Sequence, residues 1–175
     1  MSAVTIGSQP WDIARVQGIG FEGFRSVRHL FETGCLDVPV ARGIYVVVRE
    51  SQPPPGFLER SVAAWYRGKD PTVPIEVLQE KWVEGASVLY IGRAQGPGVR
   101  SLLQQRVKRY LRFGHGKVVG HWGGRYVWQL RDHMALQVAW LLHDDPSSFE
   151  RTLLASFVEA HGVLPFANLQ GEGEE

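Results

Sequence analysis

Cysteine is nearly absent from this chain, which has Cys35 alone among its 175 residues. A single thiol excludes an internal disulfide framework and any zinc site built from four cysteines, and it is compatible with a reducing compartment. The sequence also lacks a hydrophobic run of membrane-spanning length, and residues 1–10 lack the basic start and apolar stretch of a signal peptide. We therefore expect a soluble, cytoplasmic protein with no membrane partner.

Acidic residues are missing from one long stretch of the chain. Between Arg93 and Arg131 there is no Asp or Glu, but the stretch holds nine of the nineteen basic residues. The rest of the chain carries ten basic against eighteen acidic residues, so a net charge of +1 conceals a strong asymmetry. Such a block predicts a surface for a polyanion. The alternative is a solvated helix face whose charges the acidic remainder balances in space.

Aromatic residues are interleaved with these basic residues and would permit the stacking of bases, although we expect most of them to lie in the core. They are Tyr110, Phe113, Trp122, Tyr126 and Trp128. Length and a hydrophobic content of 44% predict one α/β or α+β domain rather than two.

Two β-prone runs contain the tripeptides Gly-Ile-Tyr and Tyr-Ile-Gly. The first covers residues 43–48 and the second residues 87–92, and both are rich in β-branched and aromatic side chains. We expect them to be two strands of one sheet. Between Tyr45 and Tyr90 lie 44 residues, including a Pro-Pro-Pro-Gly run that cannot continue a strand, so the pair is a hairpin with an insertion over about 50–86.

Apolar spacing predicts the remaining elements. Residues 1–20 are expected to be a loosely packed lead-in, and residues 171–175 a disordered acidic tail. Helices are predicted over 21–31, 74–82, 101–113 and 146–161. Strands are predicted over 125–130 and 135–142, the second of them central in the sheet because it is almost continuously apolar. The domain division is 1–42 as an N-terminal extension, 43–170 as the main domain and 171–175 as the tail.

Four further residues follow the two tyrosines in an order that carries information. They are Arg106 and Tyr110 in the predicted 101–113 helix, Glu150 in the last helix and Asn168 after it. In this ordered set the chain resembles the GIY-YIG endonuclease superfamily, from Gly43 to about Asn168. The resemblance implies a small α/β sandwich whose central, mostly antiparallel sheet is flanked by helices. In this chain a long insertion separates the first two strands.

The resemblance also implies a metal-dependent endonuclease that hydrolyses DNA and leaves a 5′-phosphate and a 3′-hydroxyl; RNA is not excluded as a substrate. It gives Tyr90 the role of activating or orienting water, and Tyr45 would position that water or share the role of Tyr90. Arg106 would clamp the scissile phosphate, and Glu150 would hold Mg²⁺ or another divalent cation. The implied substrate-binding residues are Arg93, Lys108, Arg109, Tyr110 and Asn168.

Phosphodiester chemistry supports these residue types. Hydrolysis requires a base for water, cations near the charged oxygens and help for the leaving alkoxide. A free tyrosine hydroxyl titrates near pH ~10, so a tyrosine acts as a base near neutrality only if neighbouring cations such as Arg106 and the metal stabilise its anion. One carboxylate suffices for Mg²⁺ when water and phosphate oxygens complete its shell.

Each residue also has a purely structural interpretation. Glu150 follows Ser147 by three positions, the capping-box spacing at a helix start. Both tyrosines suit half-buried strand positions, and Asn168 suits a turn. His115 and His121 lack metal-ligand spacing, so we expect surface or phosphate-contacting histidines.

Two rival functions remain open at this stage. One is a nucleic-acid-binding module of the same fold that lacks efficient catalysis. The other is an interaction protein whose basic block faces an acidic partner. The insertion is longer than the tight hairpin usual in the resembled family, so it is the expected place for target specificity.

Overall fold

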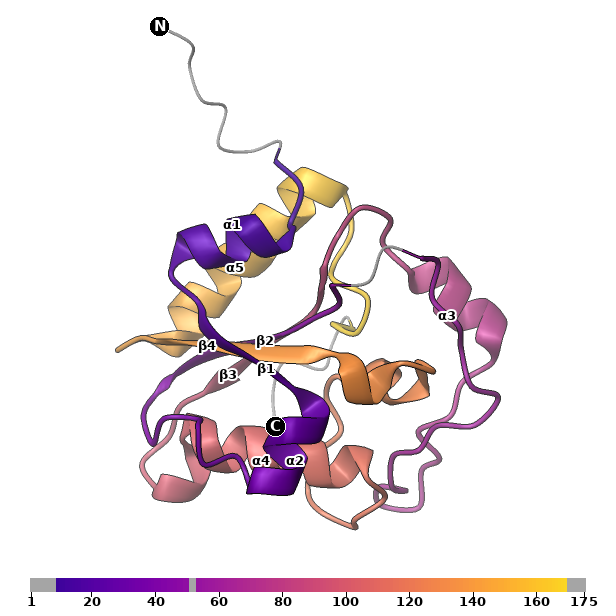
Figure 1. Ribbon diagram of the computed structural model, residues 1–175, viewed down its shortest axis with the longest axis horizontal. Helices are drawn as coiled ribbons and strands as arrows, with labels where there is room; N and C mark the ends of the chain where they lie inside the picture. The colour runs from indigo at the N-terminus through magenta and orange to yellow at the C-terminus, as the bar shows by residue number, and fades with distance from the viewer. Residues whose placement is uncertain (1–8, 51–52, 170–175) are drawn as a thin grey trace, which may run out of the picture.

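The computed structural model describes residues 9–50 and 53–169. A four-stranded sheet lies between two layers of helices (Figure 1). The strands are β1 (Glu22–Ser26), β2 (Gly43–Val48), β3 (Val88–Ala94) and β4 (Gln137–Leu142). Their order is β1-β4-β2-β3 and every neighbouring pair is antiparallel, which confirms the expected small α/β sandwich.

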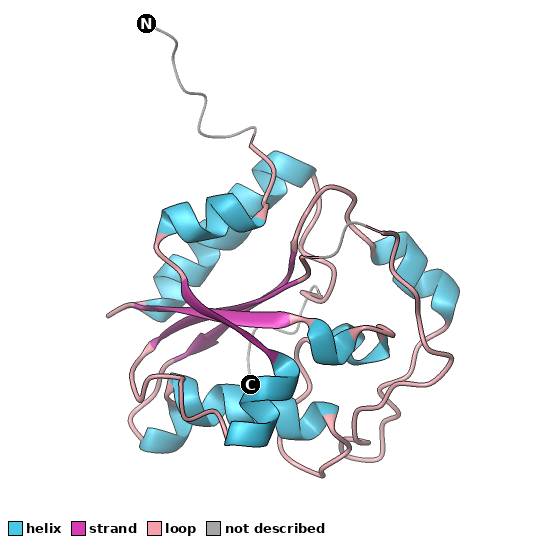
Figure 2. Ribbon diagram, viewed as in Figure 1, coloured by secondary structure: helices cyan, strands magenta, loops and turns pink. Residues whose placement is uncertain are grey.

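Helices cover both faces of the sheet. One face carries α1 (Ile13–Ile19) and α5 (Pro146–His161), and the other carries α2 (Val27–Thr33) and α4 (Leu103–Gly114) (Figure 1). Helix α3 (Ile75–Lys81) lies to one side of the sheet, within the long loops that Figure 2 shows there. Short 3₁₀ turns are η1 (Val99–Ser101), η2 (Arg125–Gln129) and η3 (His133–Ala135). Within the described residues, no helix is both long and apolar enough to cross a membrane.

The two tripeptide strands form the centre and one edge of the sheet. Strand β2 is buried at every position because β4 and β3 flank it and helices cover both its faces. Strand β3 has no neighbour beyond it among the described strands, so it forms an edge. The predicted strands 43–48, 87–92 and 135–142, with the last in a central place, are confirmed, as are the helices 74–82, 101–113 and 146–161.

The N-terminal predictions are wrong in part. Trp11 and Val16 have no exposed surface, so the described part of residues 1–20 is packed on the sheet and not a loose lead-in. The first half of the predicted 21–31 helix is strand β1, which pairs with β4 around an irregularity between Glu22 and Arg25. Phe24 has a φ of 50° and Gly23 one of 98°, and neither angle belongs to a right-handed helix.

The predicted strand over 125–130 is also wrong. Gly124, with a φ of 72°, starts the 3₁₀ turn η2 instead. Gln129 in this turn is almost completely buried, and its side-chain amide donates to the carbonyl oxygens of Leu58 (3.0 Å) and Val73 (2.8 Å). The same side chain accepts from the Val73 amide at 3.1 Å. Gln129 therefore fastens two distant parts of the insertion to the body of the protein.

Candidate functional site

A pocket with a volume of about 790 Å³ opens at the outer edge of β3. Its walls come from β3, α4, the first turns of α5, the glycine-rich loop 120–124, the insertion at 66–69 and the C-terminal segment 164–169. Six of the nine expected catalytic and substrate-binding residues line it: Tyr90, Arg93, Arg106, Arg109, Glu150 and Asn168.

The alternation of β3 explains how helices from opposite faces meet in one pocket. Successive side chains of a strand point to opposite faces. Tyr90 packs with the core on the α4 side, whereas Ile91 belongs to the core on the α5 side. Arg93 follows Ile91 by two positions and reaches Glu150 of α5. The pocket therefore wraps around the edge of the sheet, which a central strand could not provide.

Three tyrosines form one cluster behind the pocket. The ring centroids of Tyr45 and Tyr90 are 6.0 Å apart, those of Tyr90 and Tyr110 are 5.5 Å apart, and those of Tyr45 and Tyr110 are 6.1 Å apart. Tyr45 and Tyr110 have no exposed surface, and Tyr90 is half-buried and lines the pocket. Tyr90 is therefore the member of the cluster that can touch a substrate, and Tyr45 is placed to act through it.

The environment of these hydroxyls keeps them protonated. Burial raises the pKa of Tyr45, and it raises that of Tyr90 well above its ordinary value. The charge of Arg106 lowers both pKa values, in the expected direction, but burial outweighs it. In this state the neutral Tyr90 hydroxyl can orient a water molecule, whereas a basic phenolate would need further cations.

Glu150 is the carboxylate of the pocket, and Arg93 holds it. The Arg93 guanidinium donates to Glu150 Oε1 at 3.1 Å, and the glutamate side chain is only 13% exposed. Burial raises the pKa of Glu150, while the charges of Arg93 and Arg106 lower it. The capping-box interpretation is wrong, because the N-cap of α5 is Asp145, whose side chain accepts from the Ser148 amide.

Positive charge dominates the described walls of the pocket. Arg93 and Arg106 are joined by Arg109 of α4 and by Arg67 and Lys69 of the insertion, against the single carboxylate of Glu150. Such a surface attracts polyanions and concentrates their phosphates near the tyrosine cluster.

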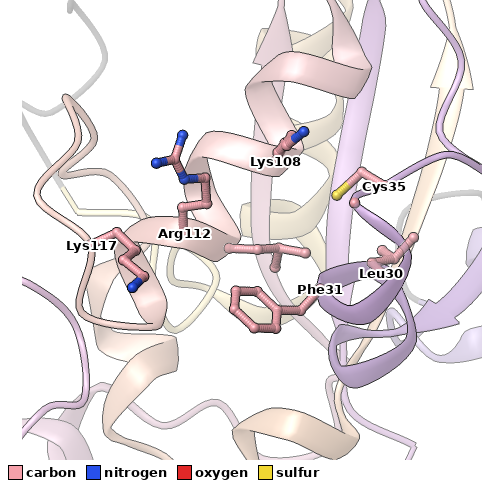
Figure 3. A pocket seen from close by; sticks show the side chains of 8 residues that line it. Leu30, Phe31, Cys35, Lys108, Arg112 and Lys117 are labelled. Carbon is pink, nitrogen blue, oxygen red and sulfur yellow. The ribbon is translucent and has the colours of Figure 1, made fainter.

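Two of the expected substrate-binding residues lie elsewhere. Lys108 points to the other side of α4, where it lines a smaller pocket of about 220 Å³ with Arg112 and Lys117 (Figure 3). Tyr110 is in the core, where its hydroxyl donates to the Gly124 carbonyl at 2.8 Å. Its burial contradicts direct contact with a substrate in this structure.

Asn168 has a structural role that the sequence did not reveal. Its side-chain oxygen accepts from the Ile91 amide and its side-chain nitrogen donates to the Ile91 carbonyl, both at 2.9 Å. The side-chain amide of Asn168 thus pairs with edge strand β3 as another strand would. The turn interpretation also holds, since the backbone N–H of Asn168 donates to the Pro165 carbonyl at 3.0 Å.

The glycine-rich loop 120–124 packs against Tyr90 and Tyr110. A Cβ at Gly123 would come within 2.9 Å of the Tyr90 hydroxyl oxygen, so this backbone lies directly against it. His121 in the same loop is buried, so the surface position among the two expected alternatives is wrong, and it lines the pocket. Burial lowers its pKa to about 3. His121 is therefore neutral at physiological pH and adds no charge for phosphate binding.

A divalent cation in this pocket would need ligands besides those of the described side chains. No cluster of three or more His, Cys, Asp or Glu side chains with metal-binding geometry occurs in ranges 9–50 and 53–169. Glu150 provides one hard oxygen donor group at the wall of a roomy polar pocket. Mg²⁺ commonly takes one or two carboxylates and completes its shell with water and phosphate oxygens, so this donor set suits it.

Comparisons with known proteins supply no name for this arrangement: no family model matches the chain, and neither a curated protein nor a solved structure does.

Proposed function

We propose that this chain is a GIY-YIG-type endonuclease that hydrolyses phosphodiester bonds of DNA with the help of Mg²⁺ or another divalent cation. The observation that carries the proposal is the pocket that collects Tyr90, Arg106 and Glu150 from β3, α4 and α5. These residues are 16 or more positions apart in the sequence, and the fold brings them to one edge of the sheet.

Residues at different places in the pocket have different roles in the proposed reaction. Arg106 and Arg109 hold the phosphate, because their cationic groups face the pocket and favour charge that develops on its oxygens. The Tyr90 hydroxyl orients the attacking water toward phosphorus, and Tyr45 fixes that hydroxyl from the buried side. Arg93 keeps the Glu150 carboxylate ionised and aimed at the pocket.

A cation held by Glu150 would supply Lewis-acid stabilisation to the phosphate oxygens and the leaving alkoxide. Because Glu150 is the single carboxylate at the described pocket wall, substrate and cation are expected to bind together.

A binding module without efficient catalysis is the second candidate. It is favoured by the raised pKa values of the tyrosines and by the ion pair between Arg93 and Glu150, which competes with a cation for the carboxylate. The two candidates share a DNA-binding pocket and differ in cleavage.

Plasmid nicking separates the two. The purified protein is incubated with supercoiled plasmid in Mg²⁺, with EDTA as the control. We expect nicking in Mg²⁺ alone, and a loss on the order of 100-fold or more in Glu150→Gln and Arg106→Ala, as is typical when a charge-stabilising group is removed. The matched control is Glu159→Gln, an exposed glutamate of the same helix. Absence of metal-dependent nicking, or full activity in Glu150→Gln, would contradict the proposal.

A further inference from the structure

We propose that the pocket takes DNA with an unpaired nucleotide beside the scissile phosphate, and that Tyr66 and Trp122 form the platform on which the unpaired base stacks. The inference rests on the proposed function, because it places this base next to the phosphate that is cut. Its evidence is a separate group of residues, contributed largely by the insertion.

The platform is a stacked pair of rings at the pocket wall. The centroids of Tyr66 and Trp122 lie 5.7 Å apart with an interplanar angle of 27°, and both residues line the pocket. Tyr66 comes from the insertion and Trp122 from the glycine-rich loop, so two segments far apart in the chain build one aromatic surface. Both side chains are half-buried, in contrast to the fully buried Tyr45 and Tyr110.

Arginine guanidinium groups cover these rings. The Arg125 guanidinium carbon lies 4.5 Å from the centroid of Trp122, and that of Arg67 lies 5.1 Å from the centroid of Tyr66. A stacked base gains more than an exposed cation–π contact does, so a base can displace either guanidinium.

The insertion holds Tyr66 in a tight turn. Tyr66 and Lys69 exchange both backbone hydrogen bonds, at 2.9 and 3.0 Å, and Arg67 and Gly68 between them have φ values of 50° and 75°. The neighbouring Ala64 amide donates to the Phe113 carbonyl at 3.0 Å, which ties the segment to the end of α4. The platform is therefore preformed rather than assembled by the ligand.

The arrangement selects against continuous duplex. In a regular helix each base is paired and stacked on its neighbours, and its faces cannot reach an aromatic wall inside a pocket. A base in a bulge, gap or flap has a free face and reaches the platform without the cost of extrusion. Phosphates of either substrate can meet Arg106 and Arg109, so the aromatic pair adds discrimination to a charge-based affinity.

Binding without a divalent cation tests the inference independently of cleavage. Fluorescence anisotropy in EDTA compares a fully paired DNA duplex with the same duplex carrying a short single-stranded bulge. We expect the wild type to bind the bulged DNA roughly 5- to 150-fold more tightly, the range given by one stacked base. Trp122→Leu, which keeps apolar volume, and Tyr66→Ala should each reduce this preference.

Trp65→Ala is the matched control, because Trp65 is an exposed aromatic of the same segment, with 59% of its surface accessible. It should retain the preference for bulged DNA. A 2-aminopurine in the bulge should be quenched by the wild type and less so by Trp122→Leu. Equal affinity for both DNAs in the wild type, or an unchanged preference in both platform variants, would overturn the inference. Preference without Mg²⁺-dependent cleavage would support the platform and contradict the endonuclease.

Discussion

The ring of Tyr45 lies across the backbone of Gly92. The two residues are directly paired between β2 and β3, and a Cβ at position 92 would approach the Tyr45 hydroxyl oxygen to 2.7 Å and its ring carbon Cζ to 2.5 Å. Because Gly92 of the second tripeptide has no side chain, it leaves room for the ring of Tyr45 of the first. A diagonal neighbour on the same face of a strand pair is within reach of an aromatic ring, and Tyr90 occupies that place.

Gly92→Ala should displace Tyr45 and, through it, Tyr90. Because Tyr45 is fully buried, it cannot swing into solvent, and we expect a loss of about 1–3 kcal/mol in the free energy of unfolding from overpacking. Urea denaturation measures this loss and plasmid nicking the accompanying loss of activity. Gly98→Ala is the control, since Gly98 has a φ of −114° and an added Cβ would meet no atom within 4 Å. Equal stability of the two variants would contradict the argument.

Tyr110→Phe removes the hydrogen bond that holds the glycine-rich loop against the tyrosines. The Gly124 carbonyl would keep its weaker bond from the Val127 amide, at 3.3 Å, so we expect a stability loss of about 1 kcal/mol rather than the full cost of a buried unpaired group. The nicking rate should fall even though the variant stays folded, because Gly124 packs against the Tyr90 ring. The buried Tyr126, changed to Phe, provides the control, and a Tyr110→Phe enzyme of full activity would argue against this role of the loop.

The elements that local pattern predicts correctly are those in which propensity and burial agree. Strand β2 is a run of β-branched and aromatic residues that is buried on both faces, and α5 has a proline at its start and Gly162 with a φ of 76° at its end. Strand β1 was predicted wrongly as part of a helix. Four apolar residues have helical spacing there, although the segment is a bulged strand joined directly to a helix: Phe24, Val27, Leu30 and Phe31. Pairing with β4 overrides that local pattern.

Site residues were predictable where they belong to a spaced motif and not where long-range packing places them. Tyr90, Arg106 and Glu150 share a pocket as expected, but nothing local distinguishes Lys108 from Arg109, which point to different pockets. Tyr66 and Trp122 carry only the weak signal of aromatics near basic residues. Their neighbourhood depends on how Gln129 and the backbone near it fasten the insertion, and such hydrogen bonds leave no periodic trace in the sequence.

Gln129→Leu should loosen the insertion. The substitution keeps a buried side chain of similar size but leaves the Leu58 carbonyl and both backbone groups of Val73 without their Gln129 partners. We expect a cost of about 1–3 kcal/mol for each group left unpaired, together with faster proteolysis within residues 53–74. Limited proteolysis and denaturant unfolding measure the two effects. Gln79→Leu on the exposed side of α3 is the control, and equal cleavage of both variants would speak against the fastening role.

Arg93→Met should shift the pH dependence of cleavage upward. Burial raises the pKa of Glu150 above its ordinary value of 4.5, and Arg93 opposes this, so removal of Arg93 raises that pKa further. The acid limb of kcat/KM against pH should move to higher pH, because the proposed cleavage mechanism needs the ionised carboxylate.

The raised pKa also affects stability. The folded state binds the Glu150 proton more tightly than the unfolded state does, so the contribution of Glu150 to stability falls as pH rises through its pKa. Arg151→Met, an exposed neighbour, should leave the limb in place, and a downward shift in Arg93→Met would refute the assigned role.

His121 should make the fold sensitive to mild acid. Its Nε2 lies 2.9 Å from the Gly123 carbonyl oxygen and can donate to it in the neutral state, and burial together with Arg106 and Arg109 lowers its pKa from 6.5 to about 3. As pH falls below 6.5, the unfolded chain takes up a proton that the folded chain refuses, so stability is lost with a slope approaching about 1.4 kcal/mol per pH unit.

Urea unfolding between pH 7 and about pH 5 measures this slope above the range in which most carboxylates titrate. His121→Phe retains a ring against Tyr110, whose centroid lies 4.8 Å from that of His121. The variant should reduce the slope of the unfolding free energy against pH by the contribution of one proton taken up on unfolding. Comparing the two proteins cancels the opposite contribution of Glu150, which both contain. A His121 imidazole NMR signal that titrates near 6.5 in the folded wild type, or equal slopes in both proteins, would show that His121 meets solvent and that the loop around Tyr90 is open rather than packed.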